Sequence, residues 1–230
     1  MARLTFHGQS CFEISANDGT RMLIDPFLTD NPVADVGPEH FMDRLDYLFL
    51  THGHSDHIGD AWTILEATEA TLIGTYEMVS YAGEKRGVEN RHAMHIGGGW
   101  DFPFGRVKMT IAVHGGKIDA PDAEAYTTIP AGFIISVDGA RVYHAGDTGL
   151  TRDMELLRGE VDVALVPIGD NFTMGPEDAG RAIRMIQPKI AVPIHYATWE
   201  MIDVDPARFV EAVGDAAEVR IMQPGDTLEL

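Results

Sequence analysis

Four side chains that can bind metal ions lie close together early in the chain. They are His52, His54, Asp56 and His57. Neutral imidazole and carboxylate are the usual non-thiol ligands of zinc and related ions. The apolar run Tyr47–Leu50 precedes them, so we expect a loop that leaves a buried strand. In an extended loop the first two histidines point the same way and can chelate one ion, while the other two side chains reach a second. A single histidine is usually a satisfied polar residue, but four ligands this close together predict metal binding.

Three polar side chains later in the chain stand at the ends of strand-like patterns. They are His114, Asp147 and His195. Loops that a rigid scaffold holds at strand ends carry many functional residues. Each of the three could be structural on its own, but together with the first four they supply five histidines and two aspartates. That set is enough for two metal sites that share a carboxylate.

This ligand set predicts two divalent metal ions. Sites of His and Asp accept zinc, manganese, iron or nickel, and availability largely decides among them, with zinc the leading choice here. Two ions about 3.5–4 Å apart can share a water, lower its pKa to ~7 and hold it as a bridging hydroxide that attacks a carbonyl or phosphoryl centre. We expect Asp56 and His195 to act in catalysis as well as in metal binding. Asp56 would orient the nucleophile and later accept a proton.

Several polar side chains near these motifs are candidates for supporting or pocket roles. They are Asp25, His144, His7, Asn171 and Thr173. A metal-bound imidazole needs a partner for its second ring nitrogen, a role that suits Asp25 and His144. His7 would line the pocket, and Asn171 and Thr173 would meet substrate just before a helix N-terminus. The alternative for each is an ordinary hydrogen-bonded or turn-forming residue. The three tryptophans are interpreted as packing residues, namely Trp62, Trp100 and Trp199.

Short strand-like runs recur along the chain, often β-branched and bounded by Gly, Pro, Asp or Asn. They span Arg3–His7, Cys11–Ser15, Arg21–Ile24, Tyr47–Leu50, Thr71–Gly74, Arg106–Val113, Gly132–Val137, Arg141–Ala145, Val161–Pro167, Ile190–Ile194 and Val219–Met222. Helical patterns span Asp60–Ala67, Tyr76–Arg86, Pro176–Ile186 and Pro206–Ala217. This mixture of hairpins and strand–helix–strand units predicts an α+β fold of two mixed sheets covered by helices. No linker or short repeat divides the chain, so we expect one domain over residues 1–230 with halves of about 1–115 and 116–230.

The charge balance limits the classes of partner. The chain carries 36 Asp and Glu against 17 Lys and Arg, a formal net charge of −19. Nucleic-acid affinity comes largely from cationic contacts to phosphates, so we expect no nucleic-acid partner and no anionic membrane surface. The single cysteine, Cys11, and the lack of an apolar leader favour a cytoplasmic location. The sequence leaves open whether the chain forms a homo-oligomer.

These residues resemble the metallo-β-lactamase superfamily, whose His-x-His-x-Asp-His signature matches residues 52–57. The later motifs follow the superfamily's order, with a His after a strand, then Gly-Asp-Thr, then a final His. More narrowly, the chain resembles the UPF0173 metal-dependent hydrolase group, which is related to the lactonase that opens ascorbate 6-phosphate. The segments that carry this resemblance are Leu23–Phe27, Thr51–Asp60, Tyr143–Leu150, Pro167–Asp178 and Pro193–Tyr196.

The resemblance implies an αββα four-layer sandwich with the metals at one edge of the two sheets. It also implies a first ion held by His52, His54 and His114, a second held by Asp56, His57 and His195, and Asp147 bridging both. One position departs from the group, which commonly reads His-Gly-His-Ser where this chain has Gln9 in third place. Glutamine cannot titrate, so an acid–base or anion-binding role there is open. The segment 115–122 also departs, and we expect it to give the pocket a wall of its own.

The expected function is hydrolysis of a small-molecule lactone, ester, amide or phosphate ester. Three alternatives stay open on the sequence: a nuclease or phosphodiesterase, an iron-dependent oxidoreductase of the same fold, and a metal-stabilised binding protein without turnover. A short acidic chain without an RNA-gripping arm disfavours the nuclease. A complete ligand set disfavours the binding protein.

Overall fold

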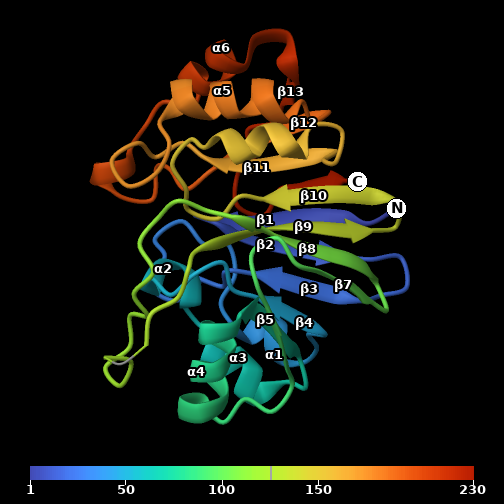
Figure 1. Ribbon diagram of the computed structural model, residues 1–230, viewed down its shortest axis with the longest axis vertical. Helices are drawn as coiled ribbons and strands as arrows, with labels where there is room; N and C mark the ends of the chain where they lie inside the picture. Colours follow the sequence, from blue (N-terminus) through green and yellow to red (C-terminus); the bar gives the residue numbers. More distant parts are fainter. Residues whose placement is uncertain (125) are drawn as a thin grey trace.

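Two seven-stranded mixed sheets form the centre of the molecule in the computed structural model, which describes residues 1–124 and 126–230 (Figure 1). The first sheet runs, in order across it, β14 (Thr227–Glu229), β1 (Arg3–Gly8), β2 (Cys11–Ser15), β3 (Arg21–Ile24), β4 (Tyr47–Phe49), β5 (Thr71–Thr75) and β6 (Arg91–Met94). The second runs β13 (Glu218–Val219), β12 (Ile190–Ile194), β11 (Val163–Pro167), β10 (Ala140–His144), β9 (Ala131–Val137), β8 (Gly105–Ile111) and β7 (Gly99–Phe102). β3 in the first sheet and β10 in the second each lie between antiparallel strands on one side and parallel strands on the other.

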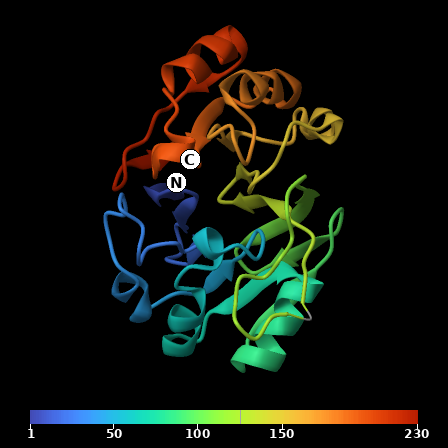
Figure 2. The ribbon, with the colours of Figure 1, turned by 90° about the vertical axis from the view of Figure 1, so that its left-hand side faces the viewer.

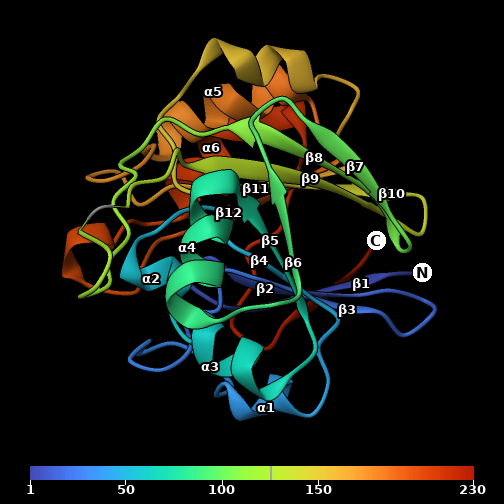
Figure 3. The same ribbon diagram turned by 60° about the horizontal axis from the view of Figure 1, so that its bottom comes forward.

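Helices cover the outer face of each sheet, which gives four layers (Figures 1 and 3). The first sheet is covered by α1 (Glu39–Met42), α3 (Ala61–Ala67) and α4 (Tyr76–Arg86). The second is covered by α5 (Pro176–Ile186), α6 (Ala207–Val213) and the 3₁₀ segment η1 (Arg152–Leu157). The apolar stripe of α5, which follows Pro176 at its first turn, packs on that sheet as its sequence predicts.

A buried apolar core joins the two sheets face to face. It includes side chains from both, such as Phe12 and Phe49 of the first and Phe133 and Val192 of the second. The rings of Phe49 and Phe133 meet edge to face with centroids 5.3 Å apart. Because aromatic side chains bury large apolar areas, this layer fixes one sheet against the other. The predicted αββα sandwich is confirmed.

Some details of the chain differ from expectation. β6, β7 and β14 carry weak strand patterns and were not predicted. The chain passes to the second sheet between Met94 and Gly99, earlier than the expected boundary at about 115, and β14 returns to the first sheet beside β1. The loop expected to be extended over 52–57 turns into a short helix, α2 (Ser55–Ile58). No helix in the described residues is long and apolar enough to cross a membrane.

One edge of the sandwich collects the loops that leave the strands. The candidate ligands follow β4 at His52, β8 at His114, β10 at Asp147 and β12 at His195. α2 lies at this edge in Figure 1, and Figure 2 turns the same edge toward the viewer. Residues distant in the sequence therefore meet because both sheets end there.

Candidate metal centre

The seven predicted ligands form two groups at this edge. One contains His52, His54 and His114, and the other contains Asp56, His57, Asp147 and His195. Within each group, one ligand atom per residue lies within 4.8 Å of every other. The structure thus brings together all seven side chains in the division that the family resemblance implies.

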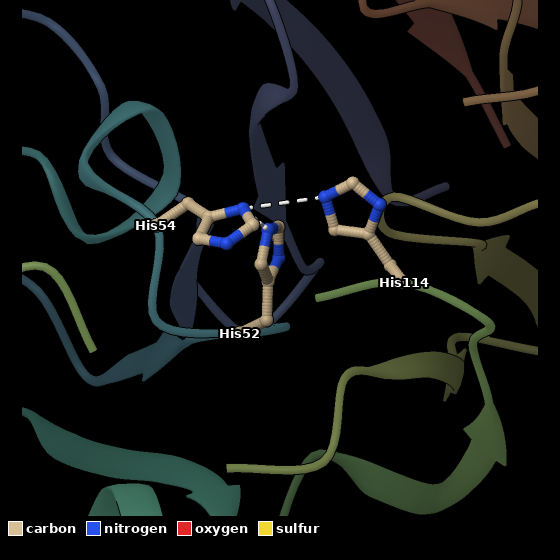
Figure 4. Close-up of side chains that lie close together, drawn as sticks. All are labelled: His52, His54 and His114. Carbon is tan, nitrogen blue, oxygen red and sulfur yellow. Dashed lines mark hydrogen bonds between the residues drawn. The ribbon is translucent and has the colours of Figure 1, made fainter. Parts of the chain in front are cut away.

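The three histidines of the first group turn nitrogen atoms toward one another (Figure 4). His54 Nδ1 lies 3.0 Å from His52 Nε2 and 3.2 Å from His114 Nε2. Zinc–nitrogen bonds of about 2.0–2.1 Å in a tetrahedral site place neighbouring ligand atoms about 3.3–3.4 Å apart. Lone pairs facing one another at such distances repel unless a proton or a cation lies between them. The spacing and chemistry of these nitrogens fit a metal ion.

Asp147 joins the two groups. Its Oδ2 lies 3.1 Å from His195 Nε2 and 3.5 Å from His114 Nε2, while its Oδ1 lies 3.3 Å from His57 Nε2. Asp56 Oδ2 completes the second group at 3.3 Å from His195 Nε2. His57 Nε2 and Asp147 Oδ1 are buried without a hydrogen-bond partner. Buried polar atoms are rarely left so, which again fits a cation between them.

Asp25 fixes which nitrogen of two ligand rings faces the centre. This fully buried carboxylate accepts hydrogen bonds from His57 Nδ1 at 2.7 Å and from Thr51 Oγ1 at 2.6 Å. Because the Thr51 hydroxyl donates its hydrogen bond to Asp25, its oxygen accepts a hydrogen bond from His52 Nδ1 at 3.0 Å. With Nδ1 engaged in this way, each imidazole turns its Nε2 toward the centre, and that nitrogen would be unprotonated once a metal ion is bound. The sequence indicated Asp25 as a supporting residue but not the relay through Thr51.

Gln9 lies inside the site. From the turn between β1 and β2, its Nε2 donates to Asp56 Oδ2 at 3.1 Å, and its Oε1 accepts from Thr198 Oγ1. Its backbone oxygen accepts from the N–H of His195 at 2.9 Å. Gln9 thus links the first sheet to the loop after β12 and holds an Asp56 oxygen. The amide positions that carboxylate without taking part in proton transfer.

The other candidates lie outside the ligand shell. His144 is buried at the end of β10, where its Nε2 donates to Ser10 O and its Nδ1 accepts from Gly146 N–H. It steadies the loop before Asp147 and does not contact a ligand. His7 is buried beside Asp35 and Glu13, 2.9 Å and 3.6 Å away, away from the metal ligands. Asn171 is exposed and Thr173 builds the turn before α5, so neither lines the cavity described below.

Burial and neighbouring charges shift the pKa values of the titratable groups in the site. Burial lowers the pKa of His52 and of His114, so both rings are neutral, as ligands must be. Burial opposes charge on Asp147 as well, but His195 and His57 outweigh it and hold the pKa of Asp147 well below its usual range. Burial also opposes charge on His57, but Asp147, Asp56 and Asp25 together outweigh burial and raise its pKa strongly. In the absence of metal, protons thus take part of the role that cations would fill.

A cavity of about 260 Å³ opens onto both ligand groups. Beside the ligands, its walls are Asp119, Phe172 and Trp199. The Trp199 ring meets His195 and Phe27 edge to face, with centroids 6.5 Å and 6.2 Å apart. We interpreted Trp199 as a packing residue, and instead it lines the site. Its position two residues after the Tyr196-Ala197 turn was the only sequence signal available.

Asp119 comes from the segment 115–122, which we expect to depart from the group. Its N–H donates to Gly53 O at 2.8 Å, which ties it to the first ligand loop. A side chain at Gly53 would bring its Cβ 2.6 Å from Lys117 O, so only glycine permits this approach. Asp119 thus gives the cavity an acidic wall, and the expected difference of this segment from the group stays a prediction.

Comparison with known proteins places the chain in a family. Residues 20–196 match the family described as the beta-lactamase superfamily domain. A UPF0173 metal-dependent hydrolase of Heliobacterium modesticaldum is 46% identical over 100% of this chain and 98% of its own length. The chain belongs to the UPF0173 metal-dependent hydrolases. A second UPF0173 protein, from Staphylococcus carnosus, is also 46% identical, over 99% of both chains.

A solved structure agrees with the UPF0173 assignment. Igni18, a metallo hydrolase from the hyperthermophilic archaeon Ignicoccus hospitalis, is 34% identical and superposes with a TM-score of 0.85. The match covers 100% of this chain and 99% of Igni18. This UPF0173 chain is therefore an enzyme of the metal-dependent hydrolase class.

Proposed function

We propose that this enzyme binds two divalent ions, zinc by preference, and uses them to hydrolyse a small-molecule lactone, ester, amide or phosphate ester. The observation that carries the proposal is the place of Asp147 between the two ligand groups. A carboxylate whose two oxygens face histidines of both groups suits a ligand shared by two ions. His52, His54 and His114 would hold one ion, and Asp56, His57 and His195 the other.

The ions, when bound, would lower the pKa of a shared water to ~7 and supply hydroxide as the nucleophile. The chain's own residues position this chemistry. Gln9 holds Asp56 Oδ2 by the 3.1 Å hydrogen bond, so the carboxylate can orient the attacking group and accept its proton. His195, fixed by its backbone bond to Gln9, faces the cavity beside Trp199. Asp56 and His195 are both proposed to act in catalysis as well as to bind metal.

The proposal is tested on the purified chain by elemental analysis and a substrate screen. We expect about two divalent ions per chain, and turnover of at least one carbonyl or phosphate ester that rises in proportion to metal content. Fully loaded protein that hydrolyses no member of these classes would contradict it. Oxygen consumption by an iron-loaded sample would instead favour an oxidoreductase.

Replacing Asp25 is expected to weaken metal binding without touching a ligand. Asp25→Asn removes the charge that keeps His57 and the Thr51 relay oriented. Loss of a hydrogen-bond partner behind a metal ligand costs about 10–100-fold in metal affinity or activity. Competition with a chelating dye measures the affinity. Thr51→Val, which breaks only the relay to His52, should cause a smaller loss confined to one ion. Equal affinity in Asp25→Asn and the native chain would show that the carboxylate does not orient these ligands.

Metal affinity is expected to rise with pH up to about 9. Burial disfavours charge on His195, but Asp147 and Asp56 together outweigh burial and raise the pKa of His195 to about 9 in the metal-free protein. The ring must lose that proton before it can bind metal, so each pH unit below this value costs about tenfold per proton. Calorimetric titration in buffers of different ionisation enthalpy counts the protons released. Release of no proton at pH 7 is the result that this account does not allow.

A further inference from the structure

We propose that the substrate is an uncharged or cationic carboxylic ester, lactone or amide with a flat apolar group beside the reacting carbonyl, and that anionic substrates are disfavoured. This inference rests on the proposed function and narrows it. In the reaction, the water oxygen bonds to the acyl carbon and the acyl C–O or C–N bond breaks. The leaving group takes one proton, and the acid product releases the other.

Two aromatic side chains form the apolar part of the cavity. Trp199 follows β12, and Phe172 lies in the loop before α5 with 46% of its surface exposed. Phe27 and His195 pack edge to face on the Trp199 ring, which leaves that ring little freedom to turn. Ring faces held beside a reactive centre favour a planar apolar group, and aromatic contacts contribute beyond the area they bury. A cavity of about 260 Å³ fits one such group with its ester.

The charged walls are acidic. Asp119 lines the cavity, and a neighbouring hollow of about 610 Å³, which shares Asp56 and Trp199 with it, is lined by Asp30 and Asp60. Among the described residues that line the two hollows there is no Lys or Arg. Lysine and arginine are the usual side chains that recognise phosphate and carboxylate. These walls therefore offer an anionic substrate no side-chain counter-charge.

Bound ions do not reverse this balance. Two divalent ions carry four positive charges, which Asp25, Asp56 and Asp147 together with a hydroxide nucleophile match in number. Asp119 pairs with Lys117 at 3.0 Å, so these two charges cancel in number, whereas Asp30 and Asp60 of the neighbouring hollow have no ion-pair partner among the described residues. The net charge at the cavity mouth is therefore negative, in keeping with the −19 of the whole chain. An anion approaching the metals meets repulsion, and a cation meets attraction.

The test compares p-nitrophenyl esters that share the reacting bond and differ only in the charge on the acyl chain. At low salt we expect kcat/KM for a trimethylammonium-bearing acyl chain to equal or exceed that for a neutral one. A carboxylate-bearing chain should fall about five- to tenfold below the neutral ester, and the gap should shrink as salt rises. Asp119→Asn should reduce the difference in kcat/KM between the neutral and the carboxylate-bearing ester. An anionic ester hydrolysed as fast as the neutral one, or a preference for phosphodiesters, would overturn the inference while leaving the hydrolase intact.

The aromatic wall is tested with paired variants. Trp199→Ala should raise KM about tenfold for a phenylacetyl ester, with a smaller effect on the acetyl ester. Trp100→Ala, at an exposed tryptophan on β7, should leave both unchanged. An equal rise in KM for both esters in Trp199→Ala would show that Trp199 has only a structural role and would overturn its proposed contact with the substrate.

A binding measurement separates this inference from failure of the proposed function. Phenyltrimethylammonium and benzyl alcohol should alter tryptophan emission of the metal-loaded protein at lower concentrations than benzenesulfonate. The change should vanish in Trp199→Tyr and persist in Trp100→Tyr. If no ester is hydrolysed but this order of binding holds, hydrolysis of esters is wrong and the ligand preference stands. Tighter binding of benzenesulfonate overturns the preference whatever the turnover shows.

Discussion

Asp147→Asn is expected to lower kcat/KM by about 10³-fold or more and to reduce the metal content to at most one ion per chain. The amide keeps the shape of the side chain but removes its charge, and it presents an N–H₂ group to His57 or to His114 and His195. Loss of several kcal/mol of metal-supported charge stabilisation corresponds to this factor, since each ~1.4 kcal/mol is tenfold in rate. Elemental analysis and steady-state kinetics on the same sample measure both effects.

The control for Asp147→Asn is Asp101→Asn. Asp101 lies on β7 with its side chain 77% exposed and paired only with Arg106, so this variant should keep native metal content and rate. Circular dichroism of both variants checks that the fold survives. An Asp147→Asn protein that retains two ions and native turnover would remove the shared carboxylate from the account.

Removal of metal is expected to lower the melting temperature by about 15–30 °C. Each ion present at a thousandfold excess over its dissociation constant stabilises the folded state by about 4 kcal/mol. A protein of this size shifts by about 2–4 °C per kcal/mol. Thermal unfolding before and after chelation with EDTA measures the shift.

Restoring zinc to the chelated protein should recover the original melting temperature. Asp147→Asn should lose less on chelation than the native chain because it starts with fewer ions. A native protein that melts at the same temperature with and without EDTA, after elemental analysis confirms removal, would indicate that the histidine cluster needs no cation.

The sequence could predict that the candidate ligands meet because strand ends are local signals. His52 follows a short apolar run that indicates a buried strand, and His195 follows another. Strand ends gather at one edge in such a sandwich, so polar residues at those positions meet without any knowledge of the long-range packing. The spacing along the first loop separated His52 and His54 from Asp56 and His57, and family resemblance assigned the three later residues.

The supporting contacts could not be predicted in the same way. Gln9 meets Thr198 across 189 positions of sequence, and its contact with Asp56 crosses 47. Such pairs depend on how the turn between β1 and β2 docks against the loop after β12, which no local pattern encodes. His144 differs from expectation in the other direction: it was a candidate partner for a metal-bound imidazole, whereas it ends β10 and both of its ring nitrogens bond to backbone groups.

The central claim, two ions that share Asp147, is tested most directly by anomalous diffraction from crystals of the protein as purified. Data collected on both sides of the zinc, iron, manganese and nickel absorption edges identify each element. The account predicts two peaks about 3.5–4 Å apart. One should lie among His52, His54 and His114 and the other among Asp56, His57 and His195, with an Asp147 oxygen near both. A single peak in crystals of protein that is fully active would contradict it.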